Sequence, residues 1–246
     1  MKSRARILIA LGLMAVAGRP AAAQNSLKDF VAWAAMMSTP YGALPPVVTP
    51  AMSGHSASTR QAGGGSSNVF ELRYGHWAFE GENDGVHAGG IGARFGQVGV
   101  IVGYEGCNGC GGNIIGGADY DATLVSQQLT SGGASSLFTV GLRPAIGFGH
   151  TTDGPGVSQV SGAVDVPFAV AVPVGATARV VPFLAPGFGF GSVRGGGDSE
   201  TGTRGSIAFG VGVVDLSPGL ALNLSWRQVF LDHGPMTIGL GMTFAR

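Results

Sequence analysis

Ten charged side chains recur at alternate positions within apolar segments, and they are the residues best placed to do chemistry. They are five acids and five arginines: Glu71, Arg73, Arg94, Glu105, Asp119, Asp121, Arg143, Asp165, Arg179 and Arg227. A buried charge requires a partner, so the equal numbers favour a paired network inside the fold, without a catalytic role. A narrow ion-conducting pore lined by the same groups is the alternative, helped by glycines that share their face.

Three pairs of His and Asp are candidates for acid–base chemistry. They are His87 with Asp84, His150 with Asp153, and His233 with Asp232. An Asp beside a His can orient a general base. However, no serine nucleophile elbow and no cluster of metal ligands accompanies them. We therefore predict no enzyme and keep a hydrolase of lipid or peptide at the barrel rim as an alternative.

The two cysteines, Cys107 and Cys110, lie in the segment Gly-Cys-Asn-Gly-Cys-Gly-Gly. In an exported protein such a pair is most often a loop disulfide. A thioredoxin-like motif would require a βαβ context, which the pattern lacks, and a metal site would require more ligands. We predict a Cys107–Cys110 disulfide, no metal site and no cofactor.

Strands must position the charged side chains. In the last segment, apolar residues from Met236 to Phe244 alternate with Thr and Gly. Successive side chains of a strand point to opposite faces, so one face of this segment is apolar and the other consists of small residues. That suits a barrel with lipid outside and other groups inside. Ten strands are predicted, with eight as the alternative: about 69–79, 87–96, 98–106, 117–127, 136–149, 159–173, 177–192, 205–214, 219–230 and 236–245.

The connections alternate between charged loops and tight turns. The charged loops are about 80–86, 107–116, 150–158, 193–204 and 231–235, and the turns are about 96–97, 130–135, 174–176 and 215–219. This alternation predicts an up-and-down antiparallel barrel with longer loops at one rim and short turns at the other, the trimmed rim. An even strand count puts both ends of the barrel at the trimmed rim.

The phase of the strands follows from the cost of an arginine on the lipid face, about 2–4 kcal/mol at the midplane. Placing the arginines and Asp165 inside turns the intervening apolar side chains, among them Val140 and Val166, toward lipid. The last strand is then expected to pair with the first near Phe70–Tyr74, which closes the barrel.

Two features depart from a simple barrel. Four prolines lie inside predicted strands, where a missing N–H removes a ladder hydrogen bond, so we expect bulges or local breaks there. They are Pro144, Pro167, Pro182 and Pro186. In addition, the large apolar residues Ile101, Val181 and Phe183 fall on the inner face.

The amino end predicts export. Three basic residues precede the apolar run 7–18, and Ala21-Ala22-Ala23 is a small-x-small cleavage site, so residues 1–23 are predicted to be a signal peptide. Removing it leaves ten basic and fourteen acidic residues, a net charge near −4, which gives no case for a nucleic-acid partner. No later run of about 18 apolar residues exists, so no helical membrane span is expected.

Residues 24–67 form an extension ahead of the strands. Ser26 and Asp29 could cap a short helix, on which Leu27, Phe30 and Val31 share one face. Residues from Pro40 to Ser67 are rich in Pro, Ser, Gly and Ala and indicate a linker with little regular structure. The helix is either a lumen plug or interfacial anchor, or part of a loosely ordered segment.

Two segments carry a resemblance to a known family. Gly141-Leu-Arg-Pro-Ala-Ile-Gly-Phe-Gly149 and Arg179-Val-Val-Pro-Phe-Leu-Ala-Pro-Gly-Phe-Gly-Phe-Gly191 resemble strands of small bacterial outer-membrane β-barrel proteins of the OmpA/OmpX-like type. The strand ending in Phe244 is similar to the carboxy-terminal signal of that family, although Ala245 and Arg246 follow the aromatic residue here. The resemblance covers about residues 68–246.

This resemblance implies an outer-membrane location, with the lipid bilayer and the barrel-assembly machinery as partners. Together with the alternating pattern, it leads us to expect an all-β transmembrane barrel with a structural or narrow-pore role. A rim-active enzyme and a soluble exported ligand-binding barrel are the alternatives.

Overall fold

The computed structural model describes residues 35–44, 46–53, 68–78, 85–107, 111–131, 134–152, 157–195, 198–230 and 236–245. The predicted signal peptide and most of the predicted helix lie outside these residues. In the described part of the chain, no helix has both the length and the apolar character that crossing a bilayer requires.

Strands account for nearly all of the described structure, as the alternating pattern predicts. Two short helices, α3 (Pro40–Ala43) and α4 (Pro50–Ser53), precede them. The strands are β1 (Asn68–Ala78), β2 (Val86–Phe95), β3 (Val98–Gly106), β4 (Gly112–Tyr120), β5 (Ala122–Ser131), β6 (Ala134–Thr151), β7 (Ser158–Asp165), β8 (Phe168–Pro173), β9 (Arg179–Gly195), β10 (Asp198–Ser217), β11 (Leu220–Val229) and β12 (Met236–Ala245).

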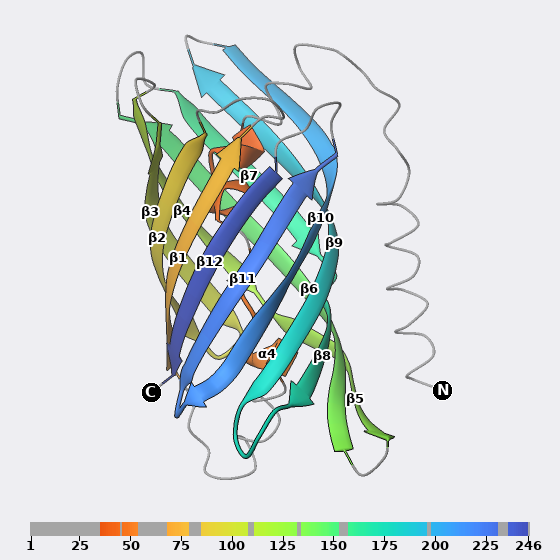
Figure 1. Cartoon of the computed structure of the whole chain (residues 1–246). Coiled ribbons are helices and arrows are strands. Elements are labelled where there is room, and N and C mark those ends of the chain that lie inside the picture. Colours follow the sequence, from red (N-terminus) through yellow and green to blue (C-terminus); the bar gives the residue numbers. More distant parts are fainter. Residues whose placement is uncertain are drawn as a thin grey trace.

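These twelve segments form one closed antiparallel barrel of ten strands, two of which are interrupted (Figure 1). β4 and β5 are two halves of one interrupted strand, since both pair with β6 and only Asp121 separates them. β7 and β8 are likewise two halves, because both lie between β6 and β9. The prediction of ten strands is therefore confirmed.

The last strand closes the barrel against the first, as predicted. β12 pairs with β1 in a continuous antiparallel register in which Phe70 faces Phe244 and Tyr74 faces Leu240. On its other side β12 pairs with β11. Neither β1 nor β12 therefore has an open edge, the arrangement that removes the risk of edge-to-edge aggregation.

Side chains alternate between an apolar exterior and a polar interior. On β1, Phe70, Leu72 and Tyr74 are exposed on the outside, whereas Glu71 and Arg73 are buried inside. Val140 and Val166 keep the predicted outward direction, since Thr139 and Asp165 beside them point into the barrel. They are nevertheless buried, because they pack with the partly buried Phe138 and Phe168 beside the interruptions at Asp121 and Val166-Pro167.

The exterior gives a direct test of lipid contact. Leu240 is 59% exposed and lies in the middle of β12. Replacing Leu240 with Arg is expected to lower the free energy of unfolding in phospholipid vesicles by about 2–4 kcal/mol, because the charge would sit near the bilayer midplane. Leu216→Arg is the matched control, since Leu216 is 47% exposed but lies at the turn-rim end of β10, where an arginine should cost only about 0–1 kcal/mol. Urea titrations that give equal losses for both variants would contradict a lipid-facing exterior.

Each of the four prolines coincides with a local interruption of the sheet. The predicted break occurs at Pro167, where β7 ends and β8 begins, and the chain there keeps bonds from Val166 N–H to the Pro186 carbonyl and from Gly141 N–H to the Pro167 carbonyl. Pro144 lies in unbroken β6, opposite the interruption between β4 and β5, where a missing N–H has no ladder partner to lose. Pro182 and Pro186 pair continuously with β10 on one side of β9. On the other side the ladder is interrupted opposite both prolines, between Val180 and Phe183 and between Leu184 and Gly187, as predicted.

The two rims differ as predicted. The turn rim carries the short connections 96–97, 132–133, 174–178 and 218–219 together with both ends of the barrel, and the loop rim carries 79–85, 107–111, 152–157, 196–197 and 230–235. One loop prediction is wrong: residues 193–204 belong mostly to the β9–β10 hairpin, which extends above the rest of the loop rim (Figure 1). At the turn rim the β5–β6 hairpin extends in the same way (Figure 1).

Candidate functional site

The interior of the barrel is occupied by residues 35–44 and 46–53, which we call the plug. Its side chains are almost all buried, including Met36, Leu44, Val48 and Met52. α3 contacts the walls β1–β4, β6 and β7, and α4 contacts β5, β6, β8 and β9. The predicted helix lies mostly outside the described residues, so its role as a plug stays a prediction. The segment from Pro40 to Ser53, predicted to be a linker with little regular structure, has only the two four-residue helices and lies inside the barrel.

The plug crosses the lumen from the loop rim toward the turn rim. Ser38 lies beside Asn113, near the loop between β3 and β4. The Ser53 carbonyl accepts a hydrogen bond of 3.1 Å from Arg179, at the start of β9 next to the turn 174–178. A direct path through the barrel is thereby occupied over most of its height.

Small polar side chains of the wall satisfy the backbone of the plug. A segment with so little helix leaves N–H and C=O groups that must find partners when buried. Bonds of 2.8–3.2 Å run from Ser225 to the Pro46 carbonyl, from Thr237 to the Gly42 carbonyl, from Thr139 to the Met52 carbonyl, and from Val48 N–H to the Asn223 amide oxygen. These contacts fix the plug in one position.

Glycines of the inner wall make room for the plug. A methyl group on Gly241 would strike Val47, and one on Gly149 would strike the Ser38 carbonyl. The same holds for Gly90 against Leu44, Gly189 against Met36 and Gly212 against Val48. The tiny inner face of β12 is thus the surface on which the plug lies.

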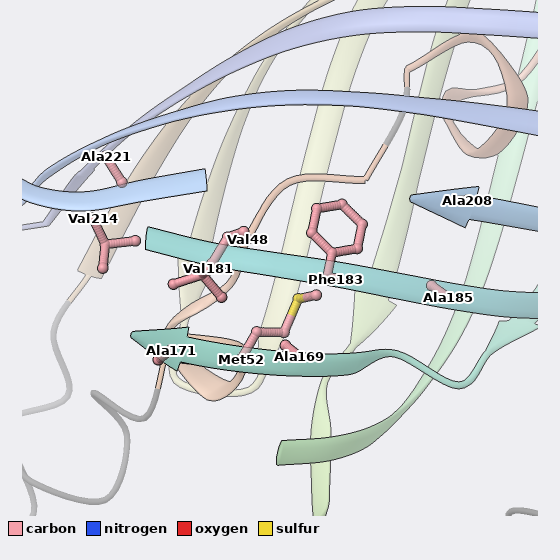
Figure 2. Packing of buried hydrophobic residues seen from close by; sticks show 10 residues of the cluster. All are labelled: Val48, Met52, Ala169, Ala171, Val181, Phe183, Ala185, Ala208, Val214 and Ala221. Carbon is pink, nitrogen blue, oxygen red and sulfur yellow. The ribbon is translucent and has the colours of Figure 1, made fainter. Parts of the chain in front are cut away.

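An apolar cluster holds the turn-rim end of the plug. Figure 2 shows Val48 and Met52 among Val181 and Phe183 of β9 and the alanines of β8, β10 and β11. The inward position of Val181 and Phe183, unexpected for a water-filled barrel, is explained by these contacts. Ile101, the third inward exception, packs in the same way against Leu44 and its neighbours.

A polar cluster holds the middle of the plug. The Tyr41 hydroxyl donates to Asp165 Oδ1 at 2.9 Å and lies 3.0 Å from Ser206 Oγ. Arg227 donates to Asp165 Oδ2 at 2.7 Å, and its guanidinium carbon lies 3.9 Å from the centre of the Tyr41 ring. The three side chains therefore form a closed unit in which a cation–π contact supplements an ion pair.

A second group of charges forms a continuous chain on the walls β1, β2, β4 and β6. Arg73 pairs with Glu71, and Arg94 bridges Glu71 and Asp119. Arg143 donates to the other oxygen of Asp119 at 2.7 Å. Each carboxylate thus has an arginine partner, which is what a buried charge requires.

The remaining predicted residues are placed less uniformly. Asp121 is buried and interacts electrostatically with Arg143, and Arg179 bonds the plug. Glu105 is buried near the loop rim, and no ion pair between described residues includes it. Cys107 is not a free thiol, but Cys110 lies outside the described residues, so their disulfide remains a prediction.

Little space remains beside the plug. The cavity between Tyr41, Pro46, Arg73, Arg143 and Arg227 has about 40 Å³ of room for the centres of water molecules. That volume holds a few waters, whereas pockets for small molecules enclose roughly 300–1,000 Å³. This cavity can therefore hold ordered water but is too small for a metabolite.

The histidines do not assemble a catalytic centre within the described residues. His87 Nδ1 lies 2.6 Å from the Tyr74 hydroxyl on the outer face, and its ring is 4.6 Å from that of His76. His150 Nδ1 lies 3.0 Å from Ser158 Oγ at the loop rim. Asp84, Asp153, Asp232 and His233 lie outside the described residues. In the described part, no group of three or more His, Cys, Asp or Glu converges on a metal-binding point.

Sequence reasoning did not single out the residues that bind the plug. They are uncharged and belong to unremarkable strand and linker patterns: Tyr41, Asn223, Ser225, Thr237, and Ser161, whose Oγ lies 2.7 Å from Thr39 Oγ1 of the plug. The signal that could have found them is combined: inward glycines on many strands, together with large inward residues such as Phe183, indicate a solid occupant of the lumen.

No family model matches the chain, and no curated protein matches it. Among solved structures, Ail, the attachment invasion locus protein of Yersinia pestis, is similar at 14% identity over 74% of this chain and 97% of that chain, with a TM-score of 0.33. The outer-membrane enzyme PagL is similar at 12% identity over 71% and 98%, with a TM-score of 0.35. An outer-membrane channel from Pseudomonas putida F1 is similar at 10% identity over 74% and 96%, with a TM-score of 0.33.

These three neighbours are outer-membrane proteins. The fold of this chain rests on its own strand register and on its alternating faces.

Proposed function

We propose that the chain is a structural outer-membrane β-barrel whose lumen is closed by its own amino-terminal plug. The observation that carries this proposal is the burial of the plug among the inner side chains of the barrel, with its backbone bonded to the wall. A conducting pore requires a continuous hydrated path, and the space left beside the plug holds only a few waters. The structural role is therefore favoured over the narrow pore.

The proposed location has independent support. The exterior carries a band of exposed apolar side chains, and a soluble protein rarely exposes contiguous apolar patches of more than a few hundred square ångströms. The predicted signal peptide provides export, and β12 provides a closing strand for the barrel-assembly machinery to recognise. With both barrel ends at the turn rim, that rim faces the periplasm and the loop rim faces the outside.

Protection of a buried thiol tests this proposal. Ala43 is 0% exposed and lies in α3 at the centre of the lumen. In the folded barrel, Ala43→Cys is expected to react with a charged, membrane-impermeant thiol reagent at least about 100-fold more slowly than Thr130→Cys, which lies exposed near the end of β5. That ratio corresponds to a local opening free energy of about 3 kcal/mol.

The unsubstituted chain, with Cys107 and Cys110, gives the background of this measurement. Unfolding in urea should make both engineered thiols equally reactive, which shows that the slow reaction comes from burial. Equal rates of thiol reaction for the two variants in the folded barrel would contradict the proposal of a closed lumen.

A rim hydrolase is the second candidate, and one observation favours it. Ser158 and His150 form a hydrogen-bonded pair at 3.0 Å on the outer face near the loop rim, where a serine could be activated by a histidine base. The ester bond of a lipid would be the substrate class. In the described part of the chain, no acidic side chain orients the other nitrogen of His150, so the pair is incomplete as a triad.

Turnover of phospholipid or lipid A esters by the refolded barrel decides this candidate. The structural proposal predicts no turnover above that of vesicles without protein. Ester cleavage that disappears in both Ser158→Ala and His150→Ala, with cleavage retained in His87→Ala, would establish the hydrolase instead.

A further inference from the structure

One strand of the barrel has an edge that no described strand covers. β5 pairs with β6 along its length, whereas its other edge has no partner strand among the described residues. The neighbouring hairpin of β2 and β3 ends where β5 begins, because Asp121 N–H bonds to the Gln97 carbonyl in the turn 96–97. β5 therefore continues past this hairpin at the turn rim (Figure 1), and we call its residues 125–131 the free edge.

The bonds on the far side of β6 show which residues of β5 turn their backbone toward the free edge. In an antiparallel sheet, alternate residues of a strand bond to opposite neighbours. Gly141 N–H bonds to the Pro167 carbonyl beside β8, so the odd-numbered residues of this part of β6 face β8, and even-numbered ones such as Phe138 face β5. Phe138 is the partner of Gln127, so Gln127 bonds to β6. The residues that direct N–H and C=O to the free edge are then Ser126, Gln128 and Thr130.

The free edge lacks the features that usually protect an exposed strand. Edge strands are commonly blunted by lysine, proline or inward-pointing charges. The segment 125–131 contains no charged residue and no proline, and the one shift of register in β5 lies before it. From Ser126 to Thr130 every side chain is exposed, and all except Leu129 are polar. Because open edges do not occur in hydrocarbon, this stretch lies in water at the turn rim.

The free edge matches the backbone of another extended chain. Each of Ser126, Gln128 and Thr130 presents one N–H donor and one C=O acceptor, and residues that face the same side of a strand are about 6–7 Å apart. A second strand offers the complementary groups at the same spacing, which is the geometry of strand addition. No side chain of the free edge is charged, so the partner strand would gain nothing from a charge of its own.

A second copy of the barrel does not fit this edge. Two copies in one membrane share their orientation, so a twofold axis between them runs along the membrane normal. Their β5 strands then both run toward the turn-rim side and cannot pair antiparallel. Parallel pairing is less stable per residue, and strands tilted in the two barrel walls would cross one another. The partner strand must therefore belong to a different polypeptide on the turn-rim side.

We propose that the free edge binds an extended, uncharged segment of a periplasmic polypeptide as an added antiparallel strand. The proposal rests on the proposed orientation of the barrel, in which the turn rim faces the periplasm. Main-chain hydrogen bonds to Ser126, Gln128 and Thr130 supply the affinity, and an apolar side chain of the partner covers Leu129, which is 43% exposed. Because one short strand buries little area, the dissociation constant is on the order of 10⁻⁵–10⁻⁴ M.

Amide hydrogen exchange, measured by NMR on the full chain refolded in uncharged detergent, tests whether the edge is free. The amides of Ser126, Gln128 and Thr130 are expected to exchange much faster than those of Gln127 and Leu129, which bond to β6. Equal protection of both sets without any added partner would mean that the edge is already paired within the chain, and it would overturn the proposal.

A fluorescent synthetic peptide with the sequence of residues 134–142 is the probe, since this stretch of β6 already pairs with the other edge of β5. The peptide should bind with saturation, seen as a rise in anisotropy, and should slow exchange at the free edge. Gln128→Pro, tolerated on an edge strand because only the free N–H is lost, should weaken binding at least about 10-fold. Gln128→Thr, which keeps the N–H, is the matched control and should bind within about twofold of the unsubstituted chain.

Backbone methylation of the peptide separates strand pairing from simple adhesion. Methyl groups on one alternate set of amide nitrogens should abolish binding, and those on the other set should leave it unchanged, because only alternate N–H groups face β5. Equal binding of both methylated peptides, or no saturable binding of the plain peptide at several times the expected dissociation constant, would overturn the proposal. So would a disulfide-linked dimer that forms in vesicles from Gln128→Cys barrels but not from Leu216→Cys barrels, since it would assign the edge to a second copy. Thiol protection of Ala43→Cys shows separately whether the lumen is closed.

Discussion

Replacing Arg227 with methionine is expected to lower the free energy of unfolding by about 3–5 kcal/mol, the usual cost of removing one partner of a buried ion pair. Arg227 is almost fully buried and is the arginine that pairs with Asp165. Without it, the carboxylate would keep only the Tyr41 hydroxyl as a strong partner, and Tyr41 would lose the cation over its ring. The plug and the wall would be weakened together.

Urea titration of the barrel refolded in phospholipid vesicles measures this loss. The double variant Asp165→Asn/Arg227→Met should lose clearly less than the sum of the two single variants, because no unpaired charge remains. Arg194→Met, which removes an exposed arginine at the end of β9, is the matched control and should change stability by no more than about 0.5 kcal/mol. Additive losses for Asp165 and Arg227 would show that they do not form a coupled pair.

Replacing Phe183 with alanine is expected to cost about 3–5 kcal/mol, because a large buried ring leaves a cavity among Val48, Met52 and Val181. Phe183 points inward from β9 and contacts the last turn of the plug (Figure 2). The loss should therefore appear in the stability of the barrel and also in the retention of the plug, which would open locally at its turn-rim end.

Thiol labelling separates these two effects. A Met52→Cys reporter should react with an impermeant reagent much faster when Phe183 is alanine than when it is phenylalanine. Phe188→Ala is the matched control on the same strand, since Phe188 points outward and is 45% exposed; it should leave labelling of the reporter unchanged. Unchanged labelling in Phe183→Ala would show that the apolar cluster does not hold the plug.

Much of the barrel could be predicted because two simple physical rules act along every strand. The side-chain period of two separates the faces, and the cost of an arginine in lipid selects which face is inside. For β12 these rules yielded the outward face of Met236 to Phe244 and its pairing with β1. The alternation of short turns with longer loops then fixed the up-and-down topology.

The irregular parts of the strands could not be predicted from the same rules. The interruption at Asp121 depends on the neighbouring Pro144, and the break after Asp165 depends on pairing with both β6 and β9. Residues 193–204 carry Gly, Ser and charged residues typical of a loop, yet pairing between β9 and β10 keeps them extended. Such outcomes are decided by partner strands that lie far away in the sequence.

The plug shows the clearest limit of sequence analysis. The plug has no sustained helical or strand period, because outside its two four-residue helices the backbone bonds side chains of the wall. Thr237 and Ser225, which lie more than 170 residues later, supply those partners. The ten charged residues could be expected inside, but the sequence did not distinguish the carboxylate of Asp165, which pairs with Arg227, from that of Glu105, which accepts a hydrogen bond from Asn113.

Conductance across a planar lipid bilayer tests the central claim of a closed lumen most directly. The protein, refolded and inserted with its plug intact, is expected to produce no discrete current steps, because the plug fills the path between the rims. Phe183→Ala should produce occasional brief current steps, and Phe188→Ala should produce none. Regular, long-lived steps from the unsubstituted chain, altered by substitution of Arg94 or Arg143, would contradict the closed barrel and establish a pore.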